Sequence, residues 1–346
     1  MMASHEVHAA AYDLPRLFID GGWVDVEHRQ TIDVIDPTTE RVLGLLPAAD
    51  DADVTRAINS ATRAFATWRN VSALDRSIYL RRASDWLRGR REEWAALISL
   101  ELGKPHRQAL LEAKTACEIL EWSAEEARRL YDRVIPARTR DMRMSTVSEA
   151  LGPVGAISGW NAPALTPARK IGYALAAGCT IVIKPSEATP ATALMIARAF
   201  EAVDLPAGVL NVIFGDPPAI GRRFATDPDI RALTFTGGTG VGKELFALCA
   251  GTIKRMVLEL GGHAPAIIFA DCDVDEVAKA AANAKYRNAG QICTSPTRFL
   301  VEASICEQFT RVFVAEIERI IVGDPFADET AMGPLQNRRR VDAVSA

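Results

Sequence analysis

The stretch from residue 154 to residue 235 alternates between short apolar runs and amphipathic helical segments. The apolar runs predict four strands, at residues 154–158, 180–184, 209–213 and 233–235. Helices are predicted between them at residues 168–177 and 191–203. Such alternation favours a doubly wound parallel sheet, whose ligands bind beyond the carboxyl ends of the strands. The sequence therefore predicts an α/β protein with a ligand site at that edge of its sheet.

The flanking segments predict helices before this sheet and a second unit after it. Short strands are expected within residues 14–46, and three amphipathic helices at residues 54–68, 75–102 and 110–127. The helical period is lost over residues 131–149, where an alternating pattern predicts a β-hairpin that reaches away from the body. After residue 262, a strand, a helix, a second strand and a second helix are expected, at 266–269, 274–288 and 298–301 and through Phe309 and Ile317. This order predicts the first part of a second α/β unit.

Composition limits the classes of partner. A chain of 346 residues, 49% apolar and 24% charged, is long enough for two ordinary domains with sizeable cores. Its net charge of −4 favours no binding to nucleic acid, and no apolar run reaches the length of a membrane span. The N-terminus lacks the basic head and the apolar core of a signal peptide. We therefore expect a small-molecule partner, with no nucleic acid and no membrane.

The cysteines and histidines predict neither disulfides nor a metal site. None of the six cysteines forms a C-x-x-C pair, and the five histidines are dispersed without metal-ligand spacing. Free thiols are typical of a reducing compartment, so a cytoplasmic location is expected. No metal is expected.

Two runs carry the residues of thioester chemistry. Cys293 lies among small and polar residues in the run Asn-Ala-Gly-Gln-Ile-Cys-Thr, and Glu259 lies in Leu-Glu-Leu-Gly-Gly, where we expect a glycine-flanked turn. A thiolate can attack a carbonyl carbon, and a carboxylate can activate the water that removes the acyl group. A buried structural thiol is the commoner role for a cysteine, but these neighbours do not make a core.

Two further runs point to a nucleotide. Residues 235–243 (Phe-Thr-Gly-Gly-Thr-Gly-Val-Gly-Lys) follow a strand and open a helix, where glycines let a pyrophosphate approach backbone N–H groups. The run is not G-x-G-x-x-G, and Glu244 occupies the position where a P-loop needs Ser or Thr. Lys184-Pro-Ser-Glu187 also follows a strand, and its lysine and carboxylate could hold ribose hydroxyls. The alternatives are a plain glycine-rich turn and an exposed strand-end ion pair.

The Cys293 and Glu259 runs resemble the two active-site signatures of the aldehyde dehydrogenase superfamily, and the resemblance covers nearly the whole chain. The motifs are most similar to those of succinate-semialdehyde dehydrogenase-like members. The resemblance implies a doubly wound dinucleotide-binding domain over residues 1–130 and 150–261. It also implies a bridging or oligomerisation hairpin at 131–149 and an incomplete catalytic domain at 262–346. The expected reaction is NAD(P)-dependent oxidation of an aldehyde to a carboxylic acid.

The resemblance assigns the catalytic roles. Cys293 would be the nucleophile and Glu259 the base that activates water. Asn161, in a run similar to the family's W-N-F-P with Ala162 in place of Phe, would form the oxyanion hole with the Cys293 backbone N–H. Lys170 matches a lysine associated with proton relay. Taken alone, Asn161 would more simply form an Asx-turn before Pro163, and Lys170 would be a helix-surface lysine.

The resemblance also assigns the cofactor site. Its expected residues are Trp160, Lys184, Ser186, Glu187, Gly237, Gly238, Gly242 and Leu260. A carboxylate at Glu187 would repel a 2′-phosphate, so NAD is favoured over NADP. Gly238 stands where relatives often carry Ser, which loosens one contact to the cofactor without removing the turn.

Two arginines suggest the substrate. Arg169 and Arg287 match the carboxylate-binding arginines of succinate-semialdehyde dehydrogenases, and a guanidinium suits a bidentate hold on a carboxylate. The expected substrate is therefore a small semialdehyde with a distal carboxylate, such as succinic semialdehyde. Ordinary surface arginines are the alternative.

The chain stops before a family landmark. No E-x-F-G-P run, whose glutamate positions the nicotinamide ribose in the family, follows Cys293. We expect a truncated polypeptide with unpaired strand edges, low solubility and weak or absent turnover. The full-length family forms homodimers or homotetramers, and assembly of this chain is doubtful.

Three other functions stay open. A CoA-acylating relative would release the thioester with CoA, although Glu259 favours water. A non-catalytic dinucleotide-binding fragment or pseudoenzyme would fit the early end of the chain. A P-loop nucleotidase is disfavoured by Glu244.

Overall fold

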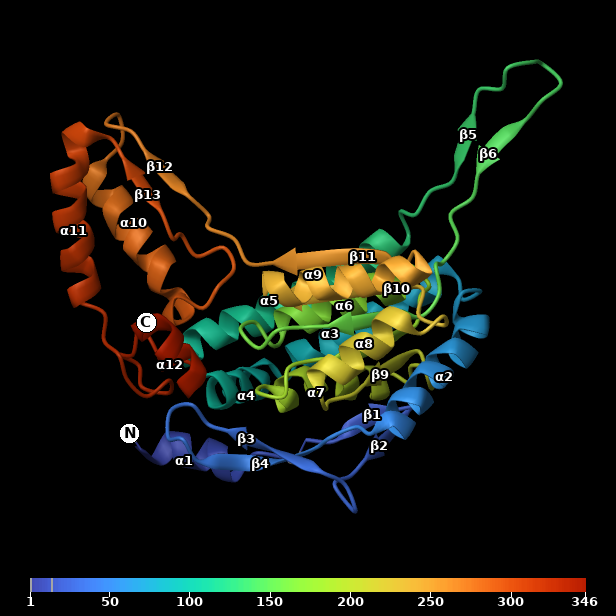
Figure 1. Cartoon of the computed structure of the whole chain (residues 1–346), viewed down its shortest axis with the longest axis horizontal. Helices are drawn as coiled ribbons and strands as arrows, with labels where there is room; N and C mark the ends of the chain where they lie inside the picture. The colour runs from blue at the N-terminus through green and yellow to red at the C-terminus, as the bar shows by residue number, and fades with distance from the viewer. Residues whose placement is uncertain (1, 14) are drawn as a thin grey trace.

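A seven-stranded sheet forms the centre of the molecule, in a computed structural model that describes residues 2–13 and 15–346 (Figure 1). Its strand order is β11-β10-β7-β8-β9-β1-β2. Five of the strands, β7 to β11, are parallel, and β1 runs antiparallel to both of its neighbours. The strands are β1 (Leu17–Ile19), β2 (Gly22–Val24), β7 (Val154–Ile157), β8 (Ile181–Lys184), β9 (Leu210–Val212), β10 (Ala232–Gly237) and β11 (Arg255–Leu260).

The parallel strands have a reversal point. From β7 the chain adds β8 and then β9 on one side, and afterwards returns to add β10 and β11 on the other side of β7. The β7–β10 boundary is therefore a topological switch point, where a crevice opens beyond the carboxyl ends of the strands. This arrangement confirms the α/β doubly wound prediction.

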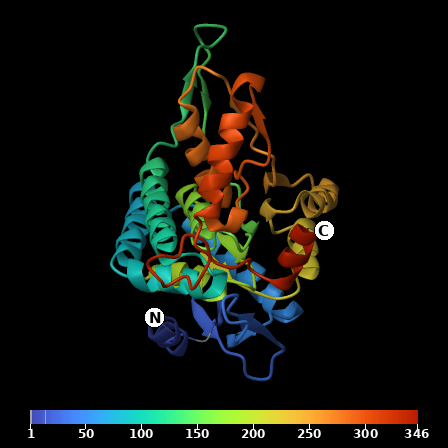
Figure 2. The ribbon, with the colours of Figure 1, turned by 90° about the vertical axis from the view of Figure 1, so that its left-hand side faces the viewer.

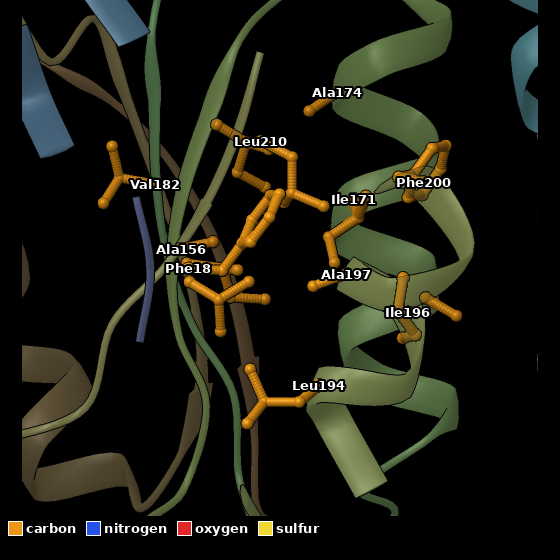
Figure 3. Packing of buried hydrophobic residues seen from close by; sticks show 14 of the residues in the cluster. Phe18, Ala156, Ile171, Ala174, Val182, Leu194, Ile196, Ala197, Phe200 and Leu210 are labelled. Carbon is orange, nitrogen blue, oxygen red and sulfur yellow. The ribbon is translucent and has the colours of Figure 1, made fainter. Parts of the chain in front are cut away.

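Helices cover both faces of the sheet. One face carries α6 (Leu165–Ala176) and α7 (Pro190–Glu201), which are backed by α3 (Ala73–Arg88), α4 (Arg91–Leu102) and α5 (His106–Ala127). The other face carries α2 (Asp51–Trp68), α8 (Pro217–Thr226) and α9 (Thr239–Cys249). Figure 3 shows Ile171 of α6 and Leu194 of α7 directed at the strand side chains. All of β7 and β8 is buried, as the continuous apolar runs predict.

One predicted helix is divided in two. The expected helix at 75–102 is α3 followed by α4, with a break at Gly89 and Arg90. Glycine has low helix propensity, and Arg90 leaves helical geometry with its guanidinium 3.9 Å from the centre of the Trp86 ring. The end of α4 is as expected, because Gly103 takes the left-handed conformation (φ 71°) that terminates a helix. The sequence interpretation did not include α1 (Met2–Ala10), α8, α12 (Arg338–Ser345) or β11.

Two antiparallel strand pairs lie outside the central sheet (Figure 1). The antiparallel pair β3 (Thr31–Ile35) and β4 (Val42–Pro47) lies beside β1 and β2. The predicted hairpin within residues 131–149 is β5 (Arg133–Ile135) and β6 (Met144–Thr146), which pair antiparallel. All six of its strand residues are exposed, so it projects into solvent rather than onto the sheet.

A separate lobe follows β11, and we call residues 266–318 the β12–β13 lobe. It consists of the parallel pair β12 (Ala266–Ile268) and β13 (Phe299–Val301), with α10 (Val274–Tyr286) and α11 (Cys306–Glu318). Its small core of Ile268, Val274, Ala278 and Phe309 is distinct from the main core. The described residues also form three short 3₁₀ segments: η1 (Ala250–Thr252), η2 (Arg287–Gly290) and η3 (Ala303–Ile305).

Residues 323–336, which we call the return segment, run from the lobe back to the body (Figure 2). The His106 N–H donates to Pro325 O at 2.8 Å. Gly333 lies so close to the Gly103 carbonyl that any Cβ at Gly333 would stand 1.7 Å from that oxygen. Buried His5 on α1 lies 3.2 Å from Asp324. The return segment is thereby fixed against α1, α4 and α5.

Candidate active site

The predicted site segments meet at the switch point of the sheet. The residues after β7 are Ser158 to Asn161, and those after β10 are Gly238 and Thr239, where α9 begins. Because β7 and β10 are parallel neighbours, both segments leave the same edge of the sheet. The asparagine run and the glycine run, 77 residues apart, are thus brought together by topology.

The glycine run forms an open helix N-terminus. Gly238 is the N-cap of α9 and has no side chain to cover the first N–H groups of the helix. A Cβ at Gly238 or Gly240 would meet nothing within 4 Å, so no neighbouring side chain crowds these two glycines. By contrast, a Cβ at Gly242 would lie 2.7 Å from the Leu260 side chain, which packs α9 on β11. The free amides suit the phosphates of a dinucleotide.

Lys184 and Glu187 form a buried ion pair at the end of β8. Lys184 is 3% exposed, its Nζ lies 2.5 Å from Glu187 Oε1, and it also donates to Pro185 O. Glu187 Oε1 accepts a hydrogen bond from Gly215 N at 3.1 Å. Burial lowers the pKa of Lys184, and the Glu187 carboxylate opposes that shift. The alternative of an exposed strand-end pair is wrong, because the side chains are largely enclosed.

Two more residues beside these strand ends bear on the fit of a dinucleotide. Ser158 Oγ is buried, and no hydrogen-bond partner for it is found in the described part of the chain. Ser186 Oγ is turned to its own backbone and accepts from Ala188 N at 3.3 Å. Trp160 is half-buried and packs against the main core. Free amides, a buried lysine–carboxylate pair and an unpaired hydroxyl at one sheet edge are groups that a dinucleotide would satisfy.

The Asn161 side chain reaches the cysteine loop. Its Nδ2 donates to Gln291 O at 3.0 Å, two residues before Cys293. Asn288 Nδ2 donates back to Asn161 O at 3.2 Å. The side chain therefore makes a tertiary contact across 130 residues of sequence rather than the local Asx-turn. One amide N–H remains beyond the bond to Gln291 O, because an asparagine amide has two.

The cysteine loop is strained and open. Asn288, Ala289 and Gly290 have φ values of 51°, 54° and 73°, and the first two are unusual for residues with a Cβ. Gln291 Nε2 donates to Asn288 O, and its Oε1 accepts from Gln336 N of the return segment. Cys293 follows and is exposed. The alternative of a buried structural thiol is therefore wrong for this residue.

Lys170 is buried beneath the sheet edge rather than on a helix surface. It is 7% exposed, and its Nζ donates to Thr234 Oγ1 of β10 at 2.8 Å. Burial lowers the pKa of Lys170 to about 8, while the Glu259 carboxylate acts in the opposite direction. Thr234 and Thr236 lie on one face of β10, two residues apart, and Glu259 is the register partner of Thr236. Lys170 and Glu259 thus share one face of the sheet.

Glu259 is exposed on edge strand β11, where a glycine-flanked turn was expected. This prediction is wrong because all six residues from Arg255 to Leu260 continue the parallel pairing with β10, and the chain turns only after Leu260. The alternation of strand side chains places Glu259 and Leu260 on opposite faces. In the described chain no hydrogen bond or ion pair of the Glu259 carboxylate is found, so it is free to act on solvent.

The two arginines lie apart from this network. Arg169 on α6 and Arg287, which follows α10, are both outside the core. Among the described residues no ion pair or side-chain hydrogen bond of either guanidinium is found. Their position fits the surface alternative as well as a hold on a free carboxylate.

Several residues that hold the site were not singled out in the sequence. Buried Lys104 and Glu112 form an ion pair behind Asn161, and Gln108 Oε1 accepts from Asn288 N at 3.2 Å. The signal in the sequence was the position of Gln108 and Glu112, which interrupt the apolar stripe of α5 near Ala109 and Ala113. A charge on a buried helix face requires a partner, but the pattern does not say which.

The remaining features of the described residues concern other pockets, metal-ligand clusters and membrane-spanning helices. A hollow of about 760 Å³ lies over β12, β13 and α11, and none of the predicted site residues lines it. Within residues 2–13 and 15–346 no cluster of three or more His, Cys, Asp or Glu side chains could hold a metal ion. No helix in that same part of the chain is long and apolar enough to cross a membrane.

Comparison with known proteins decides the family. Residues 23–346 match the family described as Aldehyde dehydrogenase family. The chain belongs to the aldehyde dehydrogenase family. It is 42% identical over 326 residues to the mitochondrial succinate-semialdehyde dehydrogenase of Arabidopsis thaliana, covering 94% of this chain and 62% of that protein.

Other members of the family give the same picture. The NADP⁺-named succinate-semialdehyde dehydrogenase of Escherichia coli is 37% identical, with coverage of 94% of this chain and 68% of that protein. The crystal structure of succinate-semialdehyde dehydrogenase from Burkholderia pseudomallei superposes with a TM-score of 0.93 at 39% identity, over 95% of this chain and 68% of that one. This chain thus spans roughly two thirds of the length of these relatives, and less than two thirds of the Arabidopsis protein.

Proposed function

We propose that this chain carries the nucleophile, the oxyanion donor and the dinucleotide site of an enzyme that oxidises a small carboxylated semialdehyde to an acid. The observation that carries the proposal is the bond from Asn161 Nδ2 to Gln291 O. It holds a side-chain amide beside an exposed cysteine in a strained loop. A donor and a nucleophile in this arrangement suit addition to a carbonyl carbon.

The chain's own residues account for the steps at the carbonyl. The Cys293 thiolate attacks the aldehyde carbon, and the carbonyl electron pair moves to oxygen to give a thiohemiacetal. The second N–H of the Asn161 amide donates to that oxyanion together with the Cys293 backbone N–H. A bound nicotinamide supplies the hydride acceptor that makes a thioester possible. Hydrolysis then requires a base, and the exposed Glu259 carboxylate takes a proton from the attacking water.

Lys170 supports a proton path from Glu259. A lysine whose pKa is about 8 can exchange a proton near neutral pH, which an ordinary lysine does poorly. Its position on the same sheet face as Glu259, with Thr234 as its hydrogen-bond acceptor, suits a relay that returns Glu259 to its basic form.

The cofactor is proposed as NAD in preference to NADP. Gly238, Gly240 and the start of α9 would hold the pyrophosphate, and Lys184 with Glu187 would hold the adenine ribose. The Glu187 carboxylate would repel a 2′-phosphate. The Escherichia coli relative is named for NADP⁺, so both dinucleotides occur among similar proteins. Tighter binding of NADP⁺ than of NAD⁺, measured by calorimetry, would overturn this preference.

The semialdehyde is proposed from Arg169 and Arg287 and from the names of the similar proteins. The domain division at residues 130, 150 and 261, the oligomerisation role of the hairpin and the cytoplasmic location remain proposals.

If CoA rather than water released the thioester, the product would be an acyl-CoA. The exposed carboxylate of Glu259 favours water as the acceptor.

Thiol labelling tests the nucleophile and the dinucleotide site together. Cys293 is exposed, whereas Cys117, Cys179 and Cys249 are buried. Iodoacetamide at low excess should modify Cys293 first, with Cys306 as the exposed comparison, and peptide mass spectrometry locates the label. Saturating NAD⁺ should change the rate at Cys293 and leave the rate at Cys306 unchanged. Equal labelling of Cys293 and Cys306, together with no effect of NAD⁺, would contradict the proposal.

A further inference from the structure

Residues 161–165, which include Asn161, and the cysteine loop are both anchored to one face of α5. Glu112 Oε1 accepts from Ala164 N at 2.9 Å and from Leu165 N at 3.3 Å, at the start of α6. Gln108 Oε1 accepts from Asn288 N, at the start of the cysteine loop. Gln108 and Glu112 are four residues apart, so they project from the same face of the helix. The spacing of one helical turn thus sets the spacing of the two halves of the site.

The Glu112 carboxylate supplies a helix cap that the local sequence lacks. The N-cap of α6 is Ala164, which has no side chain able to accept a hydrogen bond. Glu112 satisfies two of the free N–H groups from another helix, and its negative charge complements the positive end of α6. Lys170 lies on this same helix. The beginning of α6, and with it the approach to the site, is therefore fixed by α5.

Lys104 completes the anchor. Its ammonium is paired with the Glu112 carboxylate and also donates to Asn161 O at 3.4 Å. Lys104 is 7% exposed and Glu112 is 8% exposed, so the pair is shielded from water. A buried charge pair is costly to desolvate and is not by itself evidence of stability. Here its two ends contact the backbone on both sides of Pro163, between Asn161 and Ala164.

We propose that Lys104 and Glu112 are positioning residues, which hold the Asn161 backbone so that its side-chain amide meets the carbonyl bound at Cys293. This inference rests on the proposed function and extends it to residues that contact no reacting atom. A displacement of about 1 Å in such a donor can cost about 10²-fold in rate. The pair therefore affects oxyanion stabilisation without affecting the thiol itself.

Two reactions of Cys293 separate these effects in the chain as it exists. With p-nitrophenyl acetate, the thiolate forms a bond to the carbonyl carbon, p-nitrophenolate leaves with its bonding pair, and an acetyl thioester remains. This reaction passes through an oxyanion, needs no dinucleotide and is followed by the colour of p-nitrophenolate. With iodoacetamide, the thiolate displaces iodide from a saturated carbon, and no oxyanion forms. Only the first rate depends on the Asn161 amide.

The variants are chosen to avoid a lone buried charge. Lys104→Met combined with Glu112→Gln keeps side chains of similar length, and the introduced amide oxygen retains an acceptor for Ala164 N. We expect the acylation rate of this double variant to fall by about 10-fold to 10²-fold. Iodoacetamide alkylation should stay within about twofold of the unmodified chain. Lys114→Met, which removes an exposed lysine from α5, the helix that carries Glu112, is the matched control and should change neither rate.

A variant cycle identifies the route of the effect. Asn161→Ala should lower acylation by about 10²-fold to 10³-fold, and adding the double variant to it should lower the rate no further. Equal losses of acylation and alkylation, or independent effects in the cycle, would overturn the positioning role. So would an unchanged acylation rate in the double variant while Asn161→Ala lowers it. If Asn161→Ala leaves acylation unchanged, the proposed function itself fails, and this inference fails with it. Lys104→Gln combined with Glu112→Gln serves if the first double variant does not fold, with the same expected selectivity.

Discussion

The central sheet and the β12–β13 lobe bury their strands to very different extents. Every residue of β7 and β8 is buried, because helices cover both faces of the sheet. In the lobe, Ile268 is buried, but its neighbour Ile267 is 64% exposed and Leu300 of β13 is 55% exposed. The lobe strands therefore have one covered face and one open apolar face. Apolar residues form strands in both regions, but of the strands compared here only β7 and β8 remove all of their apolar surface from water.

The sharpest test of this comparison removes one large aromatic side chain from each core. Phe200 is fully buried in the main core, and Phe309 is 4% exposed in the lobe core. We expect Phe200→Ala to lower the free energy of unfolding of the main transition by about 3–5 kcal/mol. Phe309→Ala should shift a separate, earlier transition of the lobe and leave the main one in place. Denaturant unfolding, followed by site-resolved hydrogen exchange, measures both.

A single shared transition that moves equally in both variants would show that the two regions unfold as one unit. The two regions would then differ in how deeply their strands are buried but would not unfold separately.

A second test uses pH, because the shifted lysine lies in the body. The pKa of Lys170 is lowered to about 8 in the folded state, against 10.5 for an ordinary lysine. Between these two values the unfolded chain binds more protons, so this group makes stability increase with pH, by up to about 1.4 kcal/mol per pH unit. Below pH 8 its contribution is constant and unfavourable, because the folded protein must hold a buried ammonium. Lys170→Met should remove this rise.

The measurement is the free energy of unfolding of both proteins at pH values from about 7 to about 11, which span the lowered and the ordinary pKa. A parallel pair of pH profiles would show that Lys170 is not protonated differently in the two states.

The smallest effect on stability is expected at the open face of the lobe. Ile267→Thr keeps a β-branched residue on the strand and removes apolar surface that is already in contact with water. The free energy of unfolding should change by no more than about 0.5 kcal/mol. Self-association, followed by light scattering as a function of concentration, should decrease. Val257→Thr on β11, also exposed, is the comparison in the body. If self-association of the Ile267→Thr variant were undiminished, the open face of the lobe would not be its cause.

The fold was predictable where local patterns decide it. The apolar runs predicted β7 and β8 to within a residue, because a parallel strand buried on both faces is continuously apolar. The prediction of one long helix failed at Gly89, where one weak helix former and the local stacking of Arg90 on Trp86 interrupt an otherwise periodic stretch. The prediction for Glu259 failed because glycines 261 and 262 suggested a turn that begins only after the strand has paired fully with β10.

The site was predictable only in part. Residue types around Cys293 and Asn161 suggested carbonyl chemistry, and resemblance to a family supplied their roles. Spacing could not place the Asn161 amide at Gln291, since that contact depends on how two distant segments leave β7 and α10. The Lys104–Glu112 pair was not predicted for the same reason. Isolated charges in a sequence do not reveal which backbone groups they will meet.

The lobe is held to the body in two ways: by the backbone after β11 and by the contacts of the return segment. The connection from β11 to β12 runs through exposed Gly261, Gly262 and His263, a site open to proteases. A cut there would sever the backbone between body and lobe. Residues 323–336 would still contact α1, α4 and α5. The two pieces would therefore migrate together until denatured, as a nicked but intact particle.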